Sequence, residues 1–383
     1  MAGYIFALKS KNKKEIEIKK VLTEIIESGV YSTNMEIKKD KWNIPQEGTF
    51  ADYLSMKEGD NVYFFIDRKI YGVGKLVKVE GECKHLNFPG ADLPKTESYT
   101  TLKSKMILNA SEEFLNNRFI CTFEPSPYFF EEGIDMDDVL ASNPSAFKML
   151  RVFANLSFIK IDEIENKALL DVILKRNEKE IVNAENIFGV SSKIHNRIKQ
   201  LHNEDYKASS KNILKLAADG QLIKHEMAIE AGVIDYIVNN SKCIFGNWDY
   251  ISHQVVASPF KPVFYVDKMD IFGYKYIPNF NTISKYLMIE IKKDIANEEV
   301  IHQAMKYVDW INQEYSFGDY NMIEAFIVAS DFPNEVIELR NEVGKRAFIQ
   351  GRRPPITDEW TKLKLIKYVY DEQTKNLEFH EVK

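Results

Sequence analysis

The sequence predicts two domains, an α+β domain with a barrel-like sheet followed by an α/β domain. The chain has 383 residues, about twice the length of an average domain. Its first ~180 residues contain several short strands with interspersed helices, which is the pattern of an α+β domain. The region after residue 262 instead runs in the order strand, turn, strand, helix, strand, which predicts a βαβ unit.

Composition excludes several classes of protein. The chain is 45% hydrophobic and 28% charged, as folded soluble proteins are. Its net charge of −6 gives no global attraction to polyanions, although a basic groove on an acidic body can still bind nucleic acid. The three cysteines, Cys83, Cys121 and Cys243, lie far apart, which excludes a disulfide scaffold or a zinc ribbon and indicates a reducing compartment.

The chain has no apolar run of the ~18 residues that a membrane span needs. Its opening apolar segment, residues 1–8, is too short for a signal peptide and is followed by lysines. We therefore expect a cytoplasmic protein without a membrane partner.

The elements of the first domain follow from local patterns. Glycines 72 and 74 interrupt the second strand of a hairpin and indicate a bulge or a close backbone approach. Loops are expected around Trp42, Pro45 and Gly48, and over residues 80–105. The expected elements are a strand over 3–8, a helix over 11–28, hairpin strands over 61–66 and 70–79, strands over 118–123 and 158–161, and a helix over 167–181.

The chain changes character after the first domain. Residues 185–240 are polar and helical, and residues 183–224 carry seven Lys and Arg against four acidic residues, so we expect a solvated connector. The second domain follows with strands over 263–266 and 269–272, a nearly apolar strand over 286–292, a helix over 298–311 and a strand over 323–329.

Polar residues interrupt the apolar strands of the second domain. Asp270 lies between two apolar residues, and Glu290 and Lys292 share one face of a strand because they are two positions apart. Burying two carboxylates and an ammonium costs several kcal/mol unless the groups pair or bind a metal. Carboxylate oxygens are the ligands that Mg²⁺ requires.

The Glu-x-Lys spacing occurs six times in the chain, and most such pairs are surface pairs. Only Glu290 and Lys292 lie in an apolar strand, follow an Asp on a preceding strand, and precede a helix with Gln303 and Tyr307 four residues apart on one side. The combination, rather than the spacing alone, indicates a site.

This set of residues resembles the PD-(D/E)xK nuclease superfamily, in its RecB-like branch with a QxxxY motif. The segment from Gln303 to Trp310 and the strand over 323–329 resemble the NucS/EndoMS-like nuclease domain in particular. The resemblance covers about 160 residues and implies a DNA phosphodiesterase with a mixed central sheet, of the restriction-endonuclease-like fold. The implied cofactor is Mg²⁺ or Mn²⁺.

The resemblance also implies roles for single residues. The metal ligands would be Asp270, Glu290 and the backbone carbonyl of Ile291, and the catalytic set would be Glu230, Asp270, Glu290, Lys292, Gln303 and Tyr307. Two positions stay open: Glu226 competes with Glu230 as the helix glutamate, and Asp267 is a second candidate for the metal carboxylate. The interval between Asp270 and Glu290 is longer than is usual in the family.

The first domain is similar to PUA-like barrels of the EVE type. The similarity rests on residues 56–60, 62–65 and 70–74, in which Gly-Asp makes a turn and a Gly-x-Gly strand completes the hairpin. Such domains often recognise modified bases, and a flipped base needs aromatic stacking faces. The candidates are Trp42, Phe50 and Tyr53, although aromatic residues are more often part of a core.

The sequence thus predicts a PUA/EVE-like recognition domain over 1–182, a helical connector over 183–224 and a nuclease domain over 225–383. The expected function is metal-dependent DNA cleavage in modification-dependent restriction or phage defence. A structure-specific or mismatch repair endonuclease is the alternative within the enzyme class, and a non-catalytic nucleic-acid-binding protein is the alternative outside it. The expected partner is DNA, and a homodimer is possible because each chain has one active site.

Overall fold

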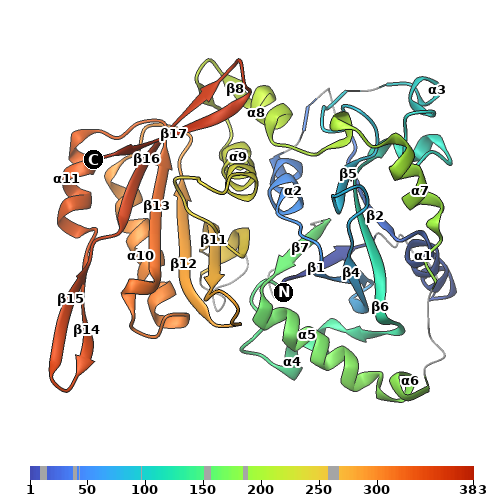
Figure 1. The fold of residues 1–383 in the computed structure, drawn as a ribbon, viewed down its shortest axis with the longest axis horizontal. Coiled ribbons are helices and arrows are strands. Elements are labelled where there is room, and N and C mark those ends of the chain that lie inside the picture. The colour runs from blue at the N-terminus through green and yellow to red at the C-terminus, as the bar shows by residue number, and fades with distance from the viewer. Residues whose placement is uncertain are drawn as a thin grey trace. The chain divides into compact units, whose positions relative to one another are not determined.

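The computed structural model describes residues 1–8, 15–37, 41–42, 44–95, 97–150, 157–183, 189–257 and 267–383. The chain forms two compact units (Figure 1). The first consists of Met1–Thr49 and Met56–Ala208, and the second of Phe50–Ser55 and Ser209–Lys383. The predicted connector over 183–224 is divided between the units at Ala208, and helix α7 (Ser192–Leu201) belongs to the first.

A seven-stranded sheet forms the centre of the first unit, in the order β2-β6-β4-β3-β1-β7 with β5 paired to β6. Strands β1 and β3 are parallel and the other pairs are antiparallel. Within the described residues β7 pairs with β1 alone, so the sheet is an open, mixed one. The strands are β1 (Gly3–Ala7), β2 (Val30–Asn34), β3 (Asn61–Ile66), β4 (Lys69–Leu76), β5 (Lys84–Leu86), β6 (Asn117–Asp135) and β7 (Phe158–Ile161).

The predicted hairpin is confirmed as β3 and β4. Gly72 has a φ of +145°, and the register of β4 against its neighbours shifts at this residue, so the bulge expected there is present. This φ favours glycine, and Tyr63 Cδ1 lies 3.2 Å from where a Cβ would stand, so a side chain there would also be crowded. The strand predicted over 158–161 has the bounds of β7, and the strand over 118–123 is part of the longer β6.

The loop predicted around Trp42, Pro45 and Gly48 is wrong in part, because helix α2 (Ile44–Leu54) runs through it. Pro45 is the second residue of α2, where the backbone N–H has no partner within the helix, so proline is tolerated there. The loop predicted over 80–105 likewise contains β5 and the short helix α3 (Tyr99–Leu102).

The remaining helices of the first unit surround its sheet. The helix predicted over 11–28 is α1 (Glu15–Ser28), and Gly29 follows it with a φ of +63°. The helix predicted over 167–181 is two helices, α5 (Glu163–Arg176) and α6 (Glu178–Asn183), separated at Asn177. The other helical segments are η1 (Glu112–Asn116), α4 (Met136–Ser142) and η3 (Glu204–Tyr206).

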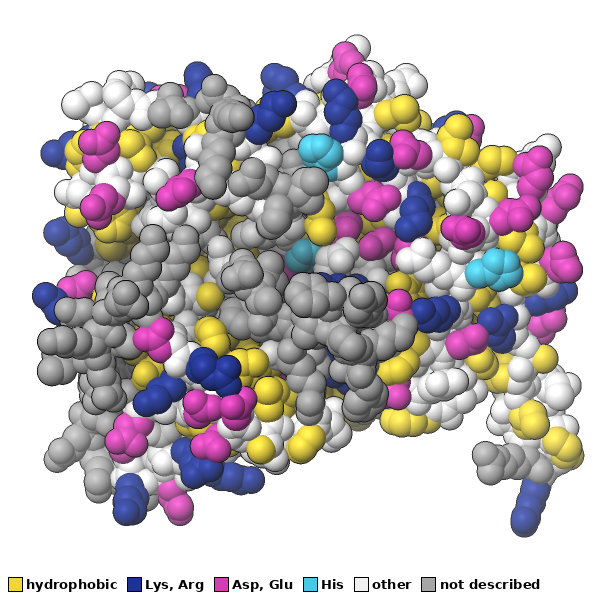
Figure 2. All heavy atoms as spheres, turned by 180° about the vertical axis from the view of Figure 1, so that it is seen from behind, with side chains coloured by type: hydrophobic (Ala, Val, Ile, Leu, Met, Phe, Trp, Pro, Cys, Tyr) yellow, Lys and Arg dark blue, Asp and Glu magenta, His cyan; other side chains and the backbone are white. Residues whose placement is uncertain are grey.

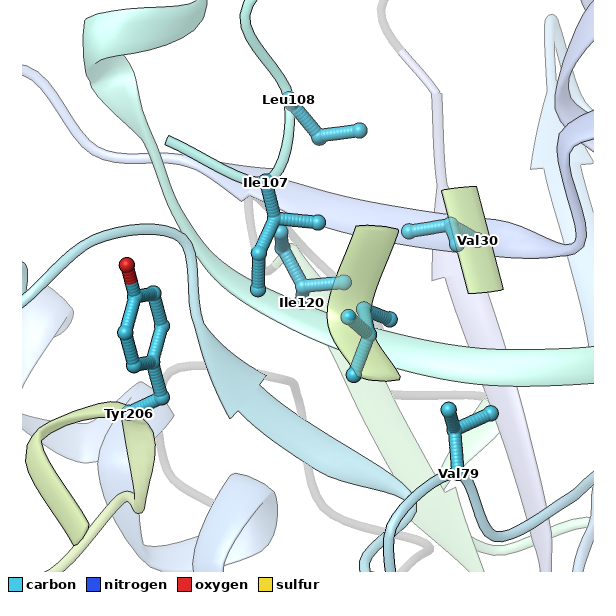
Figure 3. Packing of buried hydrophobic residues seen from close by; sticks show 7 residues of the cluster. Val30, Val79, Ile107, Leu108, Ile120 and Tyr206 are labelled. Atoms are coloured by element: carbon cyan, nitrogen blue, oxygen red, sulfur yellow. The ribbon is translucent and has the colours of Figure 1, made fainter. Parts of the chain in front are cut away.

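One hydrophobic cluster of the first unit joins segments that are far apart in the sequence (Figure 3). Its side chains come from β2, β6, the 79 and 107–108 loops, α7 and η3, so the end of this unit packs on its beginning. The members are Val30, Val79, Ile107, Leu108, Ile120, Ile198 and Tyr206.

The second unit contains a six-stranded mixed sheet in the order β10-β11-β12-β13-β16-β17. The predicted α/β class is confirmed, since α10 connects the parallel strands β12 and β13. The strands are β10 (Tyr250–Val256), β11 (Lys268–Tyr276), β12 (Ile283–Ile291), β13 (Ile323–Ala329), β16 (Leu363–Asp371) and β17 (Asn376–Val382). The predicted strand over 263–266 lies outside the described residues.

The helices of this unit are α8 (Lys211–Ala217), α9 (Glu226–Asn239), α10 (Glu298–Glu314), η5 (Tyr320–Met322) and α11 (Asn334–Val343). Residues 185–240 are not helical throughout, because β8 (Ala218–Asp219) and β9 (Leu222–Ile223) form a small hairpin between α8 and α9. A second hairpin, β14 (Arg346–Arg352) with β15 (Pro355–Trp360), lies outside the main sheet.

The last turns of α2 belong to the second unit although they come from residues 50–55. Asp52 there is buried, and its Oδ1 lies 3.0 Å from His253 Nδ1 and accepts a 3.3 Å hydrogen bond from Ser252 Oγ. Both partners lie on β10, so these contacts fix the edge strand of the sheet.

Candidate active site

Three polar residues stand side by side on neighbouring strands of the second sheet. The registers of β10 on β11 and of β11 on β12 place Gln254, Asp270 and Glu290 in one row. Residues directly opposite each other on antiparallel strands share a face, so this row brings their side chains together. Gln254 has a φ of +51°, a left-handed backbone conformation that a non-glycine residue rarely adopts.

Helix α9 adds a fourth polar side chain, Glu230. Gln254 Nε2 donates to Glu230 Oε1 at 2.9 Å and to Asp270 Oδ1 at 3.1 Å, so one amide connects two carboxylates. Glu230 is only 1% exposed. The sequence leaves Glu226 as the alternative to Glu230. In the structure Glu226 is exposed, and its Oε1 accepts a 3.4 Å hydrogen bond from the backbone N–H of Lys293.

The residue that follows strand β12 supplies the positive charge of the cluster. Lys292 Nζ lies 2.7 Å from Glu290 Oε1, and Asp270 Oδ2 accepts a 2.7 Å hydrogen bond from the Ile291 backbone N–H. Burial acts to lower the pKa of Lys292, but Glu290, Asp270 and Glu226 outweigh it and the net shift is upward. Lys292 is therefore charged at neutral pH and neutralises part of the acidic cluster.

Two carboxylate oxygens of this cluster are buried without a hydrogen-bond partner among the described residues: Glu230 Oε2 and Glu290 Oε2. Leaving a buried acceptor unpaired costs about 1–3 kcal/mol, so native structures rarely keep one without a reason. Burial and the nearby Asp270 charge raise the pKa of Glu230 and of Glu290 to about 8. Burial raises the pKa of Asp270 to about 6.

Helix α10 places Gln303 and Tyr307 on one side, as their spacing predicts, and Gln303 Nε2 donates to Tyr307 Oη at 3.3 Å. Burial raises the pKa of Tyr307 to about 12, and the charges of Glu290 and Asp270 add to this effect. Tyr307 is thus within electrostatic reach of both carboxylates. The competing Asp267 instead pairs with Lys306 at 2.7 Å.

The donor set suits a hard divalent cation, because its free acceptors are carboxylate oxygens. A bound cation would satisfy the two carboxylate oxygens that lack a hydrogen-bond partner among the described residues, Glu230 Oε2 and Glu290 Oε2. As they stand, no three His, Cys, Asp or Glu side chains of the described residues already form a ligating group. The remaining oxygens already have partners. Gln254 donates to Glu230 Oε1 and Asp270 Oδ1, the Ile291 N–H donates to Asp270 Oδ2, and Lys292 donates to Glu290 Oε1, so binding would require at least one of these contacts to open.

Sequence reasoning did not identify Gln254. It also did not identify the pair formed by Asp52 of α2 and His253, the residue that precedes Gln254 on β10. Burial acts to lower the pKa of His253, but Asp52 outweighs it and the pKa is raised. A polar Ser-His-Gln run inside the strand was the available signal. Its meaning depended on contacts with residues 50–55 and with α9, which local patterns do not reveal.

The predicted base-stacking aromatics are buried. Trp42 is 8% exposed, donates from Nε1 to the Asp92 carbonyl at 3.0 Å, and lies under the Arg118 guanidinium at 5.4 Å. Phe50 and Tyr53 are 1% and 2% exposed and belong to the second unit rather than the first. Their stacking role stays a prediction, and their burial does not favour it, since a stacked base needs an open ring face.

The described residues of each unit line a cavity. In the first unit, a cavity of about 870 Å³ lies between α1, β2 and α7, with Tyr31, Asn34, Gln46, Asn117 and Arg197 among its lining residues. In the second unit, a groove of about 460 Å³ runs along α10 from Tyr307 past Trp310 to Arg346. Each lies wholly within one unit.

Comparisons with known proteins give little. No protein-family model and no curated protein matches the chain. Among solved structures, the chain is similar in part to the crystal structure of a repair endonuclease from Pyrococcus abyssi, at 20% identity and a TM-score of 0.22. The match covers 30% of this chain and 43% of that one, which is less than half of its length. Separately, none of the described helices is long and apolar enough to cross a membrane.

Proposed function

We propose that the chain is a metal-dependent endonuclease that cleaves DNA, with its active site in the second unit. The observation that carries the proposal is the pair of buried, unpaired carboxylate oxygens of Glu230 and Glu290 beside Asp270 and Lys292. Native structures pair the large majority of their buried acceptors, so two such oxygens in one acidic cluster favour a ligand over a purely structural role. The resemblance of the same residues to the PD-(D/E)xK pattern gives the reaction class.

In this proposal Asp270, Glu290 and the Ile291 carbonyl hold Mg²⁺ or Mn²⁺. The ion, when bound, lowers the pKa of a bound water and neutralises charge on the phosphate. Glu230 adds negative charge to the metal side of the site and, through Gln254, keeps Asp270 in place. The ammonium of Lys292 orients the attacking water and stabilises the charge that develops on the phosphate.

The side chains of α10 act at the margin of the site. Tyr307 stays protonated at neutral pH, because its pKa is raised to about 12, and its hydroxyl can therefore donate a hydrogen bond. Gln303 holds that hydroxyl in place. We assign them to orientation of the phosphate or the site.

We further propose that the first unit selects the DNA, which makes modification-dependent restriction or phage defence the preferred biological role. The supporting observation is its cavity of about 870 Å³, a size that ligand-binding sites have. The lining combines apolar side chains with amide groups that can bind the edge of a base. A repair endonuclease that recognises mismatched or branched DNA is the alternative that the same cleavage assay tests.

The test is a cleavage assay with the full chain, Mg²⁺ or Mn²⁺, and plain, methylated, hydroxymethylated and mismatched duplexes, with RNA as a control. We expect cleavage that a chelator abolishes and that Lys292→Ala reduces by about 10²–10³-fold. Lys293→Ala is the matched control, because Lys293 is the next residue and pairs with exposed Asp294 instead.

Two further results decide the proposal. Mg²⁺ or Mn²⁺ should raise the melting temperature of the wild type and not that of Asp270→Asn, because a ligand stabilises only the state that binds it. Folded protein that cuts none of the substrates and is not stabilised by either metal would overturn the proposal and favour a non-catalytic binding protein.

A further inference from the structure

The hairpin β14–β15 projects from the second unit as a free ribbon. It extends away from the main sheet, and its end carries hydrophobic and basic side chains (Figures 1 and 2). Residues 353–359 are all exposed, and Ile349 and Ile356 are 60% and 56% exposed. An isolated two-stranded hairpin is marginally stable in water, so two exposed isoleucines on one indicate a partner.

The base of this ribbon is firmly packed. Trp360 is 1% exposed and donates from Nε1 to the Ile323 carbonyl at 2.9 Å, and Phe348 is 8% exposed. Both rings pack near Tyr320, with centroids 6.5 Å and 5.8 Å away. The packed base therefore fixes the direction in which the ribbon leaves the unit, whereas residues 353–359 of its outer part are exposed.

The outer part is basic in an acidic protein. Residues 349–356 read Ile-Gln-Gly-Arg-Arg-Pro-Pro-Ile, with two arginines and no acidic residue, whereas the chain has a net charge of −6. Asp358 and Glu359 lie nearer the base. This charge suits a polyanion and disfavours pairing with the same ribbon of a second copy, which would bring four arginines together.

The ribbon begins where the groove along α10 ends. Arg346, its first residue, binds Asp309 of α10 through two 2.8 Å contacts, from Nε to Oδ1 and from Nη2 to Oδ2. Arg346 also lines the groove that starts at Tyr307. Trp310, in the middle of this groove, has a buried Nε1 without a hydrogen-bond partner among the described residues. A polymer bound at Tyr307 could thus follow α10 to the ribbon.

We infer that the β14–β15 ribbon binds the DNA duplex beside the cleavage site by inserting its tip into a groove. The inference rests on the proposed function and names a part of its substrate-binding surface. A two-stranded ribbon fits a DNA groove, arginines bind the phosphates and the minor groove, and Ile or Pro side chains can wedge between base steps. At ~3.3 Å per residue the ribbon reaches ~20 Å, more than half a turn of B-DNA.

The experiment measures DNA binding by fluorescence anisotropy with the full chain carrying Glu290→Gln, which prevents cleavage. Duplexes of about 12 and about 30 base pairs are compared, so that only the longer extends from the site past the ribbon. The tip variant is Arg352→Glu with Arg353→Glu. The matched control is Lys211→Glu with Lys215→Glu, which makes the same charge change on exposed residues of α8.

We expect the tip variant to bind the longer duplex about tenfold more weakly, with a salt-dependence slope shallower by about 2, and the control to bind like the parent. The shorter duplex should show less than half of this effect on a logarithmic scale. A second variant, Ile349→Ser with Ile356→Ser, should weaken binding severalfold without changing the slope, because it removes no charge.

Unchanged affinity and slope for both variants, with melting temperatures equal to the parent, would overturn the inference. A shift from dimer to monomer in sedimentation, with DNA binding unchanged, would also overturn it and assign the ribbon to a second copy. The proposed function fails separately: a wild type that never cleaves, yet binds long duplex through the ribbon, would leave this inference standing.

Discussion

The two units each bury a cluster of carboxyl groups, but the two clusters differ in how they are satisfied. In the first unit, Glu165 accepts hydrogen bonds at Oε1 from the backbone N–H groups of Lys148 and Leu150, at 2.9 and 3.0 Å. Asp162 caps helix α5 by accepting from the Glu165 N–H. In the second unit, Glu230 and Glu290 each keep one buried oxygen without a hydrogen-bond partner in the part of the chain that the structure describes.

The pKa values do not distinguish these clusters. Burial raises the pKa of Glu165 to about 8, the same value as for Glu230 and Glu290. What differs is the partner set: Glu165 holds a segment of backbone, whereas among the described residues the Glu290 carboxylate pairs with the partly exposed Lys292. A raised pKa therefore follows from burial in both clusters, whereas the carboxylate oxygens that lack a partner among the described residues distinguish Glu230 and Glu290 from Glu165 and support the proposed metal site.

The largest expected effect separates the clusters by activity. Under the proposed function, Glu290→Gln should reduce metal-dependent cleavage by about 10³-fold or more, because it would remove a ligand of the proposed metal site and the partner of Lys292. Glu165→Gln should leave cleavage within about twofold, since an amide oxygen still accepts the two backbone bonds. The measurement is a single-turnover cleavage rate for both variants. Equal losses would mean that the two carboxyl clusters do not differ in their contribution to cleavage.

The next effect concerns stability, and here we expect the larger loss in the variant of the first unit. Glu165→Ala should destabilise the protein by about 1–3 kcal/mol more than Glu290→Ala, because it strands two buried N–H groups while both truncations leave a similar cavity. Urea unfolding of the two variants, followed by circular dichroism, measures the difference. A larger loss in Glu290→Ala would mean that the second cluster is the structural one.

A smaller effect is the pH dependence of stability. Glu290 titrates at about 8 when folded and near 4.5 when unfolded, so the unfolded state loses its proton first as pH rises. Its contribution to stability is complete below pH 4.5 and is lost progressively up to about pH 8. In chelator, Glu290→Gln should therefore gain melting temperature over the wild type at pH 8.5 and not at pH 4.5, by roughly 2–4 °C per kcal/mol relieved.

The smallest expected effect concerns the amide that joins two carboxylates. At subsaturating metal, Gln254→Ala should lower cleavage by about tenfold, because Glu230 and Asp270 lose a shared donor but keep their charges. The metal concentration for half-maximal activity should rise, whereas cleavage at saturating metal should change little. Gln254→Glu would be worse than Ala if the contact matters, since it adds a third negative charge to the pair.

The sequence predicted the parts of this fold that local patterns determine. The strands over 158–161 and 323–329 have the predicted bounds, because each is a short apolar run between polar turns. The helix α2 was missed, because Pro45 and Gly48 indicate a loop unless the proline lies in the first helical turn. Its burial comes from residues 50–55 packing in the second unit, a long-range contact.

The candidate site shows the same limit. The row of Asp270 and Glu290 followed from a carboxylate in each of two apolar strands, and Lys292 from its spacing. Glu230 could not be separated from Glu226 without knowing which side of α9 meets the sheet. Gln254 was beyond prediction, because its left-handed backbone and its two acceptors on different elements are properties of the folded chain.

The contribution of residues 50–55 to the second unit has a consequence for how the protein is made. Asp52 and its partner Ser252 are 200 residues apart. At about 5–20 residues per second, the ribosome completes β10 roughly 10–40 s after it has synthesised α2. During that time the apolar side chains of Phe50 and Tyr53 lack the residues of the second unit against which they pack in the folded chain. A fragment that starts at Ser209 would never acquire them, so the second unit of this chain should not mature as a stand-alone polypeptide.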